Sequence, residues 1–179
     1  MYKWKDDYQP HPSRKSNKIK IIDFKIKYKE VLMVKSILFV CLGNICRSPL
    51  AEGIARKIAK ERGLDILIDS AGTSNYHIGE LPDSRSIEIG RQNGVNISML
   101  KGRQISRSDS KFDLIVAMDR QNYTNISRLG LGNRLVMMGE FGLDGADIPD
   151  PYYGDNQDFK MVYDMLYKAI NTMFDEVLK

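Results

Sequence analysis

The chain has 179 residues, of which 42% are hydrophobic and 28% are charged, as expected for one globular domain with a sizeable core. The formal net charge is +4, but residues 1–40 carry ten Lys or Arg against four Asp or Glu, whereas the rest of the chain carries seventeen against nineteen. The basic character belongs to the N-terminal segment, which argues against a nucleic-acid-binding domain.

Two further classes of protein are disfavoured. No apolar run approaches the roughly 20 residues that a membrane-spanning helix needs, and the first residues lack the apolar core of a signal peptide. We therefore expect no membrane span and a cytoplasmic location.

Two cysteines are too few for a disulfide framework, and the two histidines join no cluster with metal-ligand spacing. The sequence predicts neither a metal nor a cofactor.

Residues 1–34 are expected to form an N-terminal extension ahead of a domain that spans residues 35–179. The first 18 residues or so are polar and are typical of an unpacked arm. Ile22–Lys29 alternates apolar and polar residues, a pattern that an added edge strand would also show. We favour the alternative, in which translation starts at Met33 and the preceding residues are a poorly ordered extension.

From Ser36 onward, predicted strands alternate with predicted helices. Strands are expected at residues 36–41, 65–69, 112–117 and 135–137. Helices are expected from about Pro49 to Gly63, Asp83 to about Gln92, Asp119 to about Leu129, and about Asn156 to Leu178. This alternation predicts a single-domain α/β three-layer sandwich, with a parallel sheet of about four strands and helices on both faces.

The loop after the first strand is the expected ligand site, because parallel sheets bind ligands at the carboxyl ends of their strands. It reads Cys41-Leu-Gly-Asn-Ile-Cys-Arg-Ser-Pro49 and joins a buried strand to a helix. Such a junction directs unpaired amide N–H groups and the positive end of the helix dipole to one point. We expect Gly43 to adopt a positive φ and Asn44 to tolerate a left-handed conformation, so that the amides surround an oxyanion.

The residue types in this loop suit nucleophilic catalysis. The amides, the helix end and the cation of Arg47 would stabilise the thiolate of Cys41. The planar guanidinium of Arg47 can hold two phosphoryl oxygens, a geometry that lysine does not offer. Ser48 offers a hydroxyl that would help the thiolate to leave, and it also fits a helix N-cap. The alternative for Cys41 is a buried cysteine that only packs, which a bare C-x5-R pattern does not exclude.

The full nine-residue string, placed between a strand and a helix, is far more specific than C-x5-R. It resembles the phosphate loop of the low-molecular-weight protein tyrosine phosphatases, and the resemblance covers about Lys35 to the C-terminus. It implies an enzyme that hydrolyses phosphotyrosine and aryl phosphate monoesters in tyrosine-phosphorylated proteins through a cysteinyl-phosphate intermediate. Cys41 would be the nucleophile and Arg47 the phosphate clamp.

A second segment carries the resemblance late in the chain. Asp150-Pro151-Tyr152-Tyr153 matches the family's Asp-Pro-Tyr segment, which implies that Asp150 protonates the leaving phenolate and then activates a water molecule. Its alternative is a turn aspartate before proline. Asp147 and Asp155 are nearby carboxylates that the sequence alone does not exclude from this role.

The resemblance also implies a substrate slot and a support for the loop. Tyr152, Tyr153 and Tyr76 match aromatic wall positions, and Leu42 would complete an apolar slot that suits a phenyl phosphate ester. Ser70 matches the serine that hydrogen-bonds the loop asparagine. The expected phosphate- and substrate-binding residues are Leu42, Gly43, Asn44, Ile45, Cys46, Ser48, Tyr76, Tyr152 and Tyr153. Each tyrosine alone is more often a packing residue.

Three rival functions and one ambiguous cysteine remain at this point. An arsenate reductase on this scaffold needs further cysteines, and none follows Cys46. A protein-arginine phosphatase typically has threonine where Ile45 stands, and a non-catalytic phosphate-binding module would not need Cys41.

Cys46 either forms a reversible disulfide with Cys41 or is a buried thiol without redox function. We expect a monomer.

Overall fold

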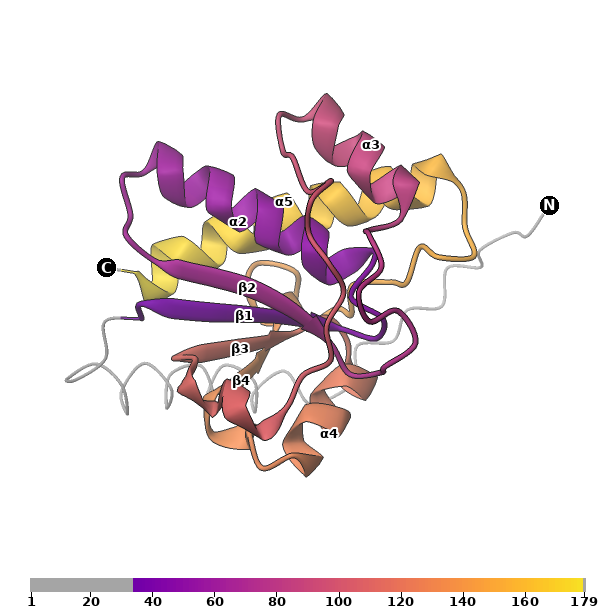
Figure 1. Cartoon of the computed structure of the whole chain (residues 1–179). Helices are drawn as coiled ribbons and strands as arrows, with labels where there is room; N and C mark the ends of the chain where they lie inside the picture. Colours follow the sequence, from indigo (N-terminus) through magenta and orange to yellow (C-terminus); the bar gives the residue numbers. More distant parts are fainter. Residues whose placement is uncertain (1–33, 179) are drawn as a thin grey trace, which may run out of the picture. The chain divides into compact units, whose positions relative to one another are not determined.

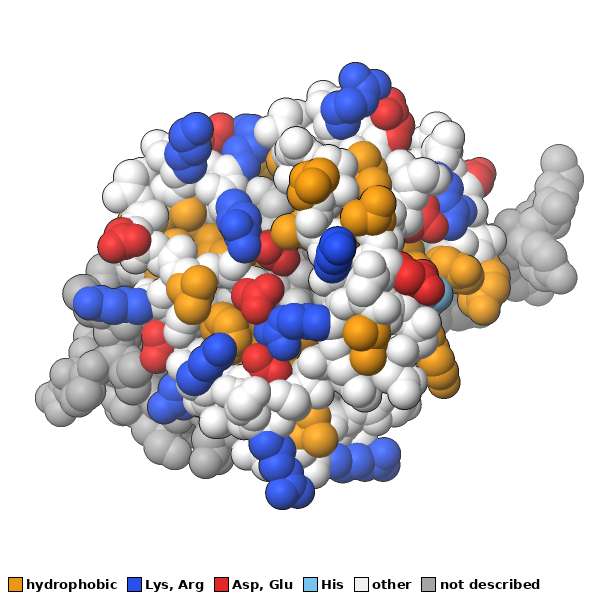
Figure 2. Space-filling model, viewed as in Figure 1, with side chains coloured by type: hydrophobic (Ala, Val, Ile, Leu, Met, Phe, Trp, Pro, Cys, Tyr) orange, Lys and Arg blue, Asp and Glu red, His pale blue; other side chains and the backbone are white. Residues whose placement is uncertain are grey.

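A computed structural model describes residues 34–178 of the chain (Figure 1). The predicted polar arm and the predicted strand Ile22–Lys29 lie outside the described residues. Within them, no helix has the length and apolar character required to cross a membrane. Lys and Arg side chains are interspersed with Asp and Glu on the face shown in Figure 2.

Four parallel strands form one sheet in the described part of the chain. They are β1 (Ser36–Cys41), β2 (Leu67–Gly72), β3 (Leu114–Ala117) and β4 (Leu135–Met137). The strand order is β2-β1-β3-β4, so β1 pairs with β2 on one side and with β3 on the other. The order reverses between β1 and β3, which places the carboxyl end of β1 at the switch point where ligands of such sheets bind.

Helices cover both faces of this sheet, as predicted. They are α2 (Arg47–Glu61), α3 (Ser84–Gln92), α4 (Arg120–Arg128) and α5 (Asn156–Val177). Helices α2 and α5 lie against one face, with α3 packed against them, whereas α4 lies against the other face beside β3 and β4 (Figure 1). Three short 3-10 helices that the sequence did not predict complete the described chain: η1 (Arg107–Lys111), η2 (Gly132–Arg134) and η3 (Met138–Glu140).

The core lies on both sides of β1. Residues Ile37 to Val40 are fully buried, which explains why this strand is a continuous apolar run rather than an alternating one. On one side, β1 and β3 pack against Ile126 of α4. On the other, an apolar stripe of α5 is buried from Phe159 to Met173. The fold is therefore the predicted α/β sandwich.

Three element boundaries differ from the predictions. Strand β2 begins at Leu67 and extends to Gly72, three residues beyond the predicted end, and a Cβ at Gly72 would lie 2.7 Å from the carbonyl oxygen of Leu42. Glycine at this position therefore allows the end of β2 to approach the phosphate loop. Helix α2 begins at Arg47, two residues before Pro49, and β3 begins at Leu114 because Phe112 ends η1.

Candidate active site

Cys41 is the last residue of β1, and its side chain is buried at the carboxyl end of the sheet. The backbone N–H of Asn44 donates to its Sγ at 3.3 Å, and Ser48 Oγ lies 3.0 Å from the same sulfur. Helix α2 begins six residues later at Arg47, so the amide N–H groups of its first turn have no partner within the helix. The sulfur therefore lies where positive partial charges converge.

The sharp turn of this loop occurs at Asn44 and not at Gly43. Asn44 has a φ of 57°, one of two positive values among the described non-glycine residues, whereas Gly43 does not adopt a positive φ. The expectation for Gly43 was therefore wrong. Glycine fits there for a different reason, because a Cβ at Gly43 would lie 2.9 Å from Cδ2 of His77 and would displace this ring.

The side chain of Asn44 holds this turn through three hydrogen bonds. Its Nδ2 donates to Ser48 Oγ and to Ser70 Oγ, each at 2.9 Å, and its Oδ1 accepts from the backbone N–H of Arg103 at 2.9 Å. Asn44 is only 3% exposed, so these bonds satisfy polar groups that water does not reach. The left-handed conformation is thus stabilised by side-chain contacts to two other segments.

Ser48 is the second residue of α2 and not its N-cap, a position that Cys46 occupies. Its hydroxyl accepts from Asn44, lies 3.2 Å from the carbonyl oxygen of Ala71, and lies 3.0 Å from Cys41 Sγ. A hydroxyl has one proton to donate. Ser48 can therefore direct this proton to the carbonyl or to the sulfur.

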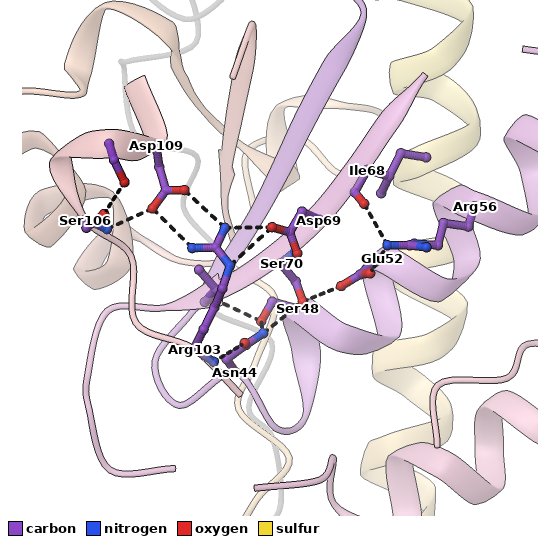
Figure 3. A network of polar contacts seen from close by, with 12 residues as sticks. Asn44, Ser48, Glu52, Arg56, Ile68, Asp69, Ser70, Arg103, Ser106 and Asp109 are labelled. Atoms are coloured by element: carbon purple, nitrogen blue, oxygen red, sulfur yellow. Dashed lines mark hydrogen bonds and ion pairs between the residues drawn. The ribbon is translucent and has the colours of Figure 1, made fainter. Parts of the chain in front are cut away.

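A buried carboxylate continues the network behind the loop (Figure 3). Ser70 Oγ donates to Oε2 of Glu52 at 2.6 Å, and Glu52 Oε1 lies 2.6 Å from the guanidinium of Arg56. Glu52 is only 2% exposed, and burial raises its pKa, although the bonds from Ser70 and Arg56 partly counteract this effect. The carboxylate anchors Ser70 from the side opposite Asn44.

Arg103 forms the other half of the support (Figure 3). Its guanidinium binds Asp69 at 2.8 Å and the buried Asp109 at 3.1 Å. Asp109 also accepts from the backbone N–H of Ser106 at 2.8 Å. The backbone N–H of Arg103, which binds Asn44, is thereby fixed between β2 and η1.

Arg47 is the centre of a second group of charges. It is 2% exposed, and its two terminal nitrogens bind Asp119 at 2.7 Å and Asp150 at 2.6 Å. Burial alone would lower the pKa of Arg47, but the negative charges of Cys41 and the two aspartates outweigh it and raise the pKa. Its buried Nε has no hydrogen-bond partner among the described residues. This donor is the one that a bound oxyanion could satisfy.

Among the three candidate carboxylates, only Asp150 reaches Arg47. Its Oδ2 accepts from Arg47, and its Oδ1 accepts from the backbone N–H of Tyr152 at 3.2 Å. Asp147 binds Arg120 at 2.8 Å, and Asp155 caps the start of α5. The structure therefore brings Asp150 to the phosphate loop from about a hundred residues away in sequence and leaves the other two in structural roles.

The predicted slot residues are exposed near the loop. The rings of Tyr152 and Tyr153 meet edge to face at 5.0 Å, and the ring of His77 lies 6.4 Å from that of Tyr152. Leu42 and Tyr76 are also exposed. The mouth of the site is thus formed by apolar and aromatic side chains with histidine among them.

Ile45 and Cys46 point into the protein interior. They are buried with Phe159 of α5 in a small apolar cluster. Both cysteines of the chain are free, and burial, followed by the negative charge of Asp83, raises the pKa of Cys46. A thiol of this kind stays protonated at neutral pH and packs as a small apolar group.

Four site residues were not predicted from sequence: His77, Glu52, Arg103 and Asp119. Asp119 was assigned only as the N-cap of α4, and it does accept from the backbone N–H of Asn122 at 2.7 Å while its other oxygen binds Arg47. An aspartate directly after a strand, at the switch point of the sheet, is a signal that could have found it. Nothing in the local sequence distinguishes the other three from ordinary surface residues.

Comparisons with known proteins agree with this geometry. The family model described as low molecular weight phosphotyrosine protein phosphatase matches residues 36–179. A protein of that name from Schizosaccharomyces pombe is 42% identical over 136 residues, covering 71% of this chain and 86% of the relative. The Sus scrofa protein of the same name is 35% identical over 154 residues, covering 81% of this chain and 97% of the relative.

A solved structure supports the same grouping. The crystal structure of a protein tyrosine phosphatase from Entamoeba histolytica, with Hepes in its active site, superposes with a TM-score of 0.75. The two chains are 36% identical, and their alignment covers 78% of this chain and 94% of the solved chain. The curated relatives are matched over most of their own length, so the similarity extends across the whole domain and not only over the loop.

Proposed function

We propose how the residues of this site act, from the premise that the chain belongs to the low molecular weight phosphotyrosine protein phosphatase family. The chain is a protein-tyrosine phosphatase, and its substrates are phosphoproteins. The names of the curated relatives do not favour the arginine phosphatase, arsenate reductase or non-catalytic alternatives. The roles of individual residues are our proposal, and the observation that carries it is the ion pair that joins Arg47 to Asp150 beside Cys41.

In the first step, the thiolate of Cys41 attacks the phosphorus of phosphotyrosine. A sulfur–phosphorus bond forms as the bond from phosphorus to the phenolic oxygen breaks, and the electron pair leaves with that oxygen. The N–H of Asn44 and the hydroxyl of Ser48 already contact the sulfur and help to hold it as the thiolate. The amides at the start of α2 would bind the phosphoryl oxygens.

Arg47 holds the phosphoryl group during this transfer. Its Nε is unpartnered, and one of its terminal nitrogens faces Asp150, a carboxylate that an arriving phosphate can replace. Two parallel N–H bonds to equatorial oxygens would track the charge of the transition state. Asp119, which is anchored as the N-cap of α4, would keep one terminal nitrogen in place.

Asp150 serves as the general acid and then as the general base. When phosphate takes over the donors of Arg47, the carboxylate of Asp150 loses its ion pair, takes up a proton from solvent and gives that proton to the leaving oxygen. In the second step, Asp150 takes a proton from water, the resulting hydroxide attacks phosphorus, and the sulfur–phosphorus bond breaks. Inorganic phosphate leaves, and Ser48 stabilises the departing thiolate of Cys41.

The test is hydrolysis of p-nitrophenyl phosphate at mildly acidic pH in the presence of a metal chelator. We expect the wild type to turn over, Cys41→Ser to be inactive, and Asp150→Ala to be slower by about 10²- to 10³-fold. Asp147→Ala is the matched control, because Asp147 binds Arg120 and should leave the rate unchanged. An inactive wild type, or a Cys41→Ser variant with wild-type activity, would refute the mechanism.

Three further points complete the proposal. A nucleophilic thiol must stay reduced, which supports a cytoplasmic location for an enzyme that depends on Cys41. The family match begins at residue 36, which supports residues 1–34 as an extension and 35–179 as the catalytic domain. We also propose that the enzyme is a monomer that does not bind nucleic acid; the slight acidity of the chain beyond residue 40 supports the second point.

A further inference from the structure

The turn that follows Asp150 lies largely on the surface of the domain. Pro151 is buried, but every residue from 152 to 157 is exposed. The backbone N–H of Gly154 donates to the carbonyl of Pro151 at 2.9 Å, which closes the turn without fixing it to another element. The side chain of Asp150 is itself 41% exposed. The position of Asp150 therefore depends on contacts from outside the turn.

Arg85, the second residue of α3, supplies two such contacts. Its terminal nitrogens donate to the carbonyl of Tyr152 and to the carbonyl of Gly154, each at 3.0 Å. Helices α3 and α5 pack against each other, so the start of α3 lies beside the segment that leads into α5 (Figure 1). These two bonds tie the exposed part of the turn to a helix that precedes it by more than sixty residues.

Arg85 is itself held in one orientation. Its Nε and one terminal nitrogen donate to the two carboxylate oxygens of Asp83 at 3.0 and 2.7 Å, and its guanidinium lies 4.3 Å from the centre of the Phe159 ring. A two-point pair and a stacked ring fix the plane of a guanidinium. The bond from Arg85 lowers the pKa of Asp83, so the ion pair persists at mildly acidic pH.

The same pair also contacts the loop of the nucleophile. The backbone N–H of Asp83 donates to the carbonyl of Ile45 at 2.8 Å. At the other end, the carbonyl of Tyr152 accepts from Arg85, while the N–H of Tyr152 donates to Asp150 Oδ1 at 3.2 Å. Asp83 and Arg85 thus connect the phosphate loop to the segment that carries the proposed acid.

We propose that Arg85 is a positioning residue, which holds Asp150 within reach of the leaving oxygen by fixing the carbonyls of Tyr152 and Gly154. The proposal rests on the proposed function, because it takes Asp150 as the general acid. When phosphate takes over the donor of Arg47 that binds Asp150, the acid loses its ion pair at the moment it must act. The bonds from Arg85 to the turn remain and keep the acid in place.

The experiment measures kcat/KM for two aryl phosphates that differ in their need for an acid. Phenolate leaves phenyl phosphate readily only with a proton, whereas dinitrophenolate leaves 2,4-dinitrophenyl phosphate as a stable anion. Arg85→Met keeps a long side chain over Phe159 but removes every donor. It should lower kcat/KM about tenfold for phenyl phosphate, since a displaced acid forfeits part of its contribution, and leave the dinitrophenyl ester nearly unchanged.

Two reference variants bracket this result. Asp150→Ala should show the same selective loss for phenyl phosphate, and a larger one. Arg85→Lys keeps the cation but lacks the planar fork that spans Asp83 and both carbonyls, so its kcat/KM for phenyl phosphate should lie between those of the wild type and Arg85→Met. It also applies the test if Arg85→Met does not fold.

Arg62→Met provides the matched control. Its side chain is 33% exposed, against 31% for Arg85, and it binds Asp175 and Asn171 of α5 at 2.7 and 2.8 Å. Arg62 also lies over a phenylalanine ring, that of Phe174, but at the end of α5 remote from Asp150. This variant should hydrolyse both esters as the wild type does.

Each outcome separates the positioning role from the proposed function. If Arg85→Met slows both esters equally, or leaves phenyl phosphate at the wild-type rate while Asp150→Ala slows it, Arg85 does not position the acid and the proposal is wrong. If Asp150→Ala shows no greater loss for phenyl phosphate than for the dinitrophenyl ester, Asp150 is not the general acid and the proposed mechanism itself fails.

Discussion

The phosphate loop lies between two regions that are built in opposite ways. On one side, buried side chains hold it: Asn44 is bound by Ser48, Ser70 and the backbone of Arg103. On the other side, backbone N–H groups and the hydroxyl of Ser74 attach the segment between β2 and α3 that carries Ile78, and the apolar side chains of Ile78 and Leu81 are exposed. The first region fixes the geometry of the loop, and the second presents exposed side chains beside it.

The two regions should therefore respond differently to substitution. Removing a side chain from the buried network leaves a polar partner without a hydrogen bond, which costs about 1–3 kcal/mol for each partner. Removing an exposed side chain typically changes stability by at most about 0.5 kcal/mol. Substitutions on the buried side should lower stability and turnover together, whereas those on the exposed side should change only substrate binding.

The largest effect is expected for Asn44→Ala. It removes three hydrogen bonds and places a residue with a Cβ in the left-handed region, so we expect a loss of roughly 3 to 5 kcal/mol in the free energy of unfolding. Turnover of p-nitrophenyl phosphate should fall by at least about tenfold. Urea unfolding and steady-state kinetics measure the two effects.

Asn44→Gly is the companion variant for this position. It loses the same hydrogen bonds but tolerates the positive φ, so it should be more stable than Asn44→Ala by about 1 kcal/mol. Equal stability of the two variants would show that the backbone at Asn44 is not strained and that hydrogen bonds alone matter there.

A smaller effect, dependent on pH, is expected for Glu52→Gln. Burial raises the pKa of Glu52 in the folded protein above its usual value of 4.5, so the folded state binds more protons than the unfolded state between these two values. The stability of the wild type should fall as pH rises through this window. Glutamine does not titrate but can still accept from Ser70, so the variant should lack this decline.

The measurement is urea unfolding of both proteins between pH 4 and pH 8. The stability of Glu52→Gln relative to the wild type should increase across the range, because only the wild type loses stability as the pH rises. If the difference in the free energy of unfolding between the two proteins stays constant with pH, Glu52 has the same pKa in the folded and unfolded states.

The smallest effect on stability is expected for Tyr153→Ala. Tyr153 is almost fully exposed and contacts Tyr152 edge to face, so the free energy of unfolding should change by at most about 0.5 kcal/mol. The KM for p-nitrophenyl phosphate should rise about threefold, because an edge of the slot is lost. A destabilisation comparable to that of Asn44→Ala would show that the exposed side also holds the fold.

The sequence predicted the fold well because the signals were local. A continuous apolar run marked β1, and aspartates marked the starts of α3 and α4. Chemical reasoning also brought Cys41 and Arg47 to one loop, since a strand, a turn and a helix confine nine residues to a small volume. The family resemblance then supplied Asp150, which local patterns could not have linked to this loop.

The remaining site residues depend on tertiary contacts that no spacing encodes. Arg103 supports Asn44 through its backbone N–H, a group that every residue except proline carries, so its identity gave no clue. Gly43 was interpreted as a turn glycine because glycine is the usual choice for positive φ. The structure shows a tertiary contact instead: the ring of His77, more than thirty residues away, would have to move to admit a Cβ at Gly43.

The backbone attachment of the segment between β2 and α3 has a consequence for how this enzyme could be altered. Because Ser74, Gly79 and Asp83 fix the segment through main-chain groups, the side chains between them can be exchanged without moving the nucleophile. The surface chemistry beside the site and the geometry of the nucleophile can then change separately, so mutation can alter the first without damaging the second. A library randomised at positions 78 and 81 would begin from active enzymes in nearly every member.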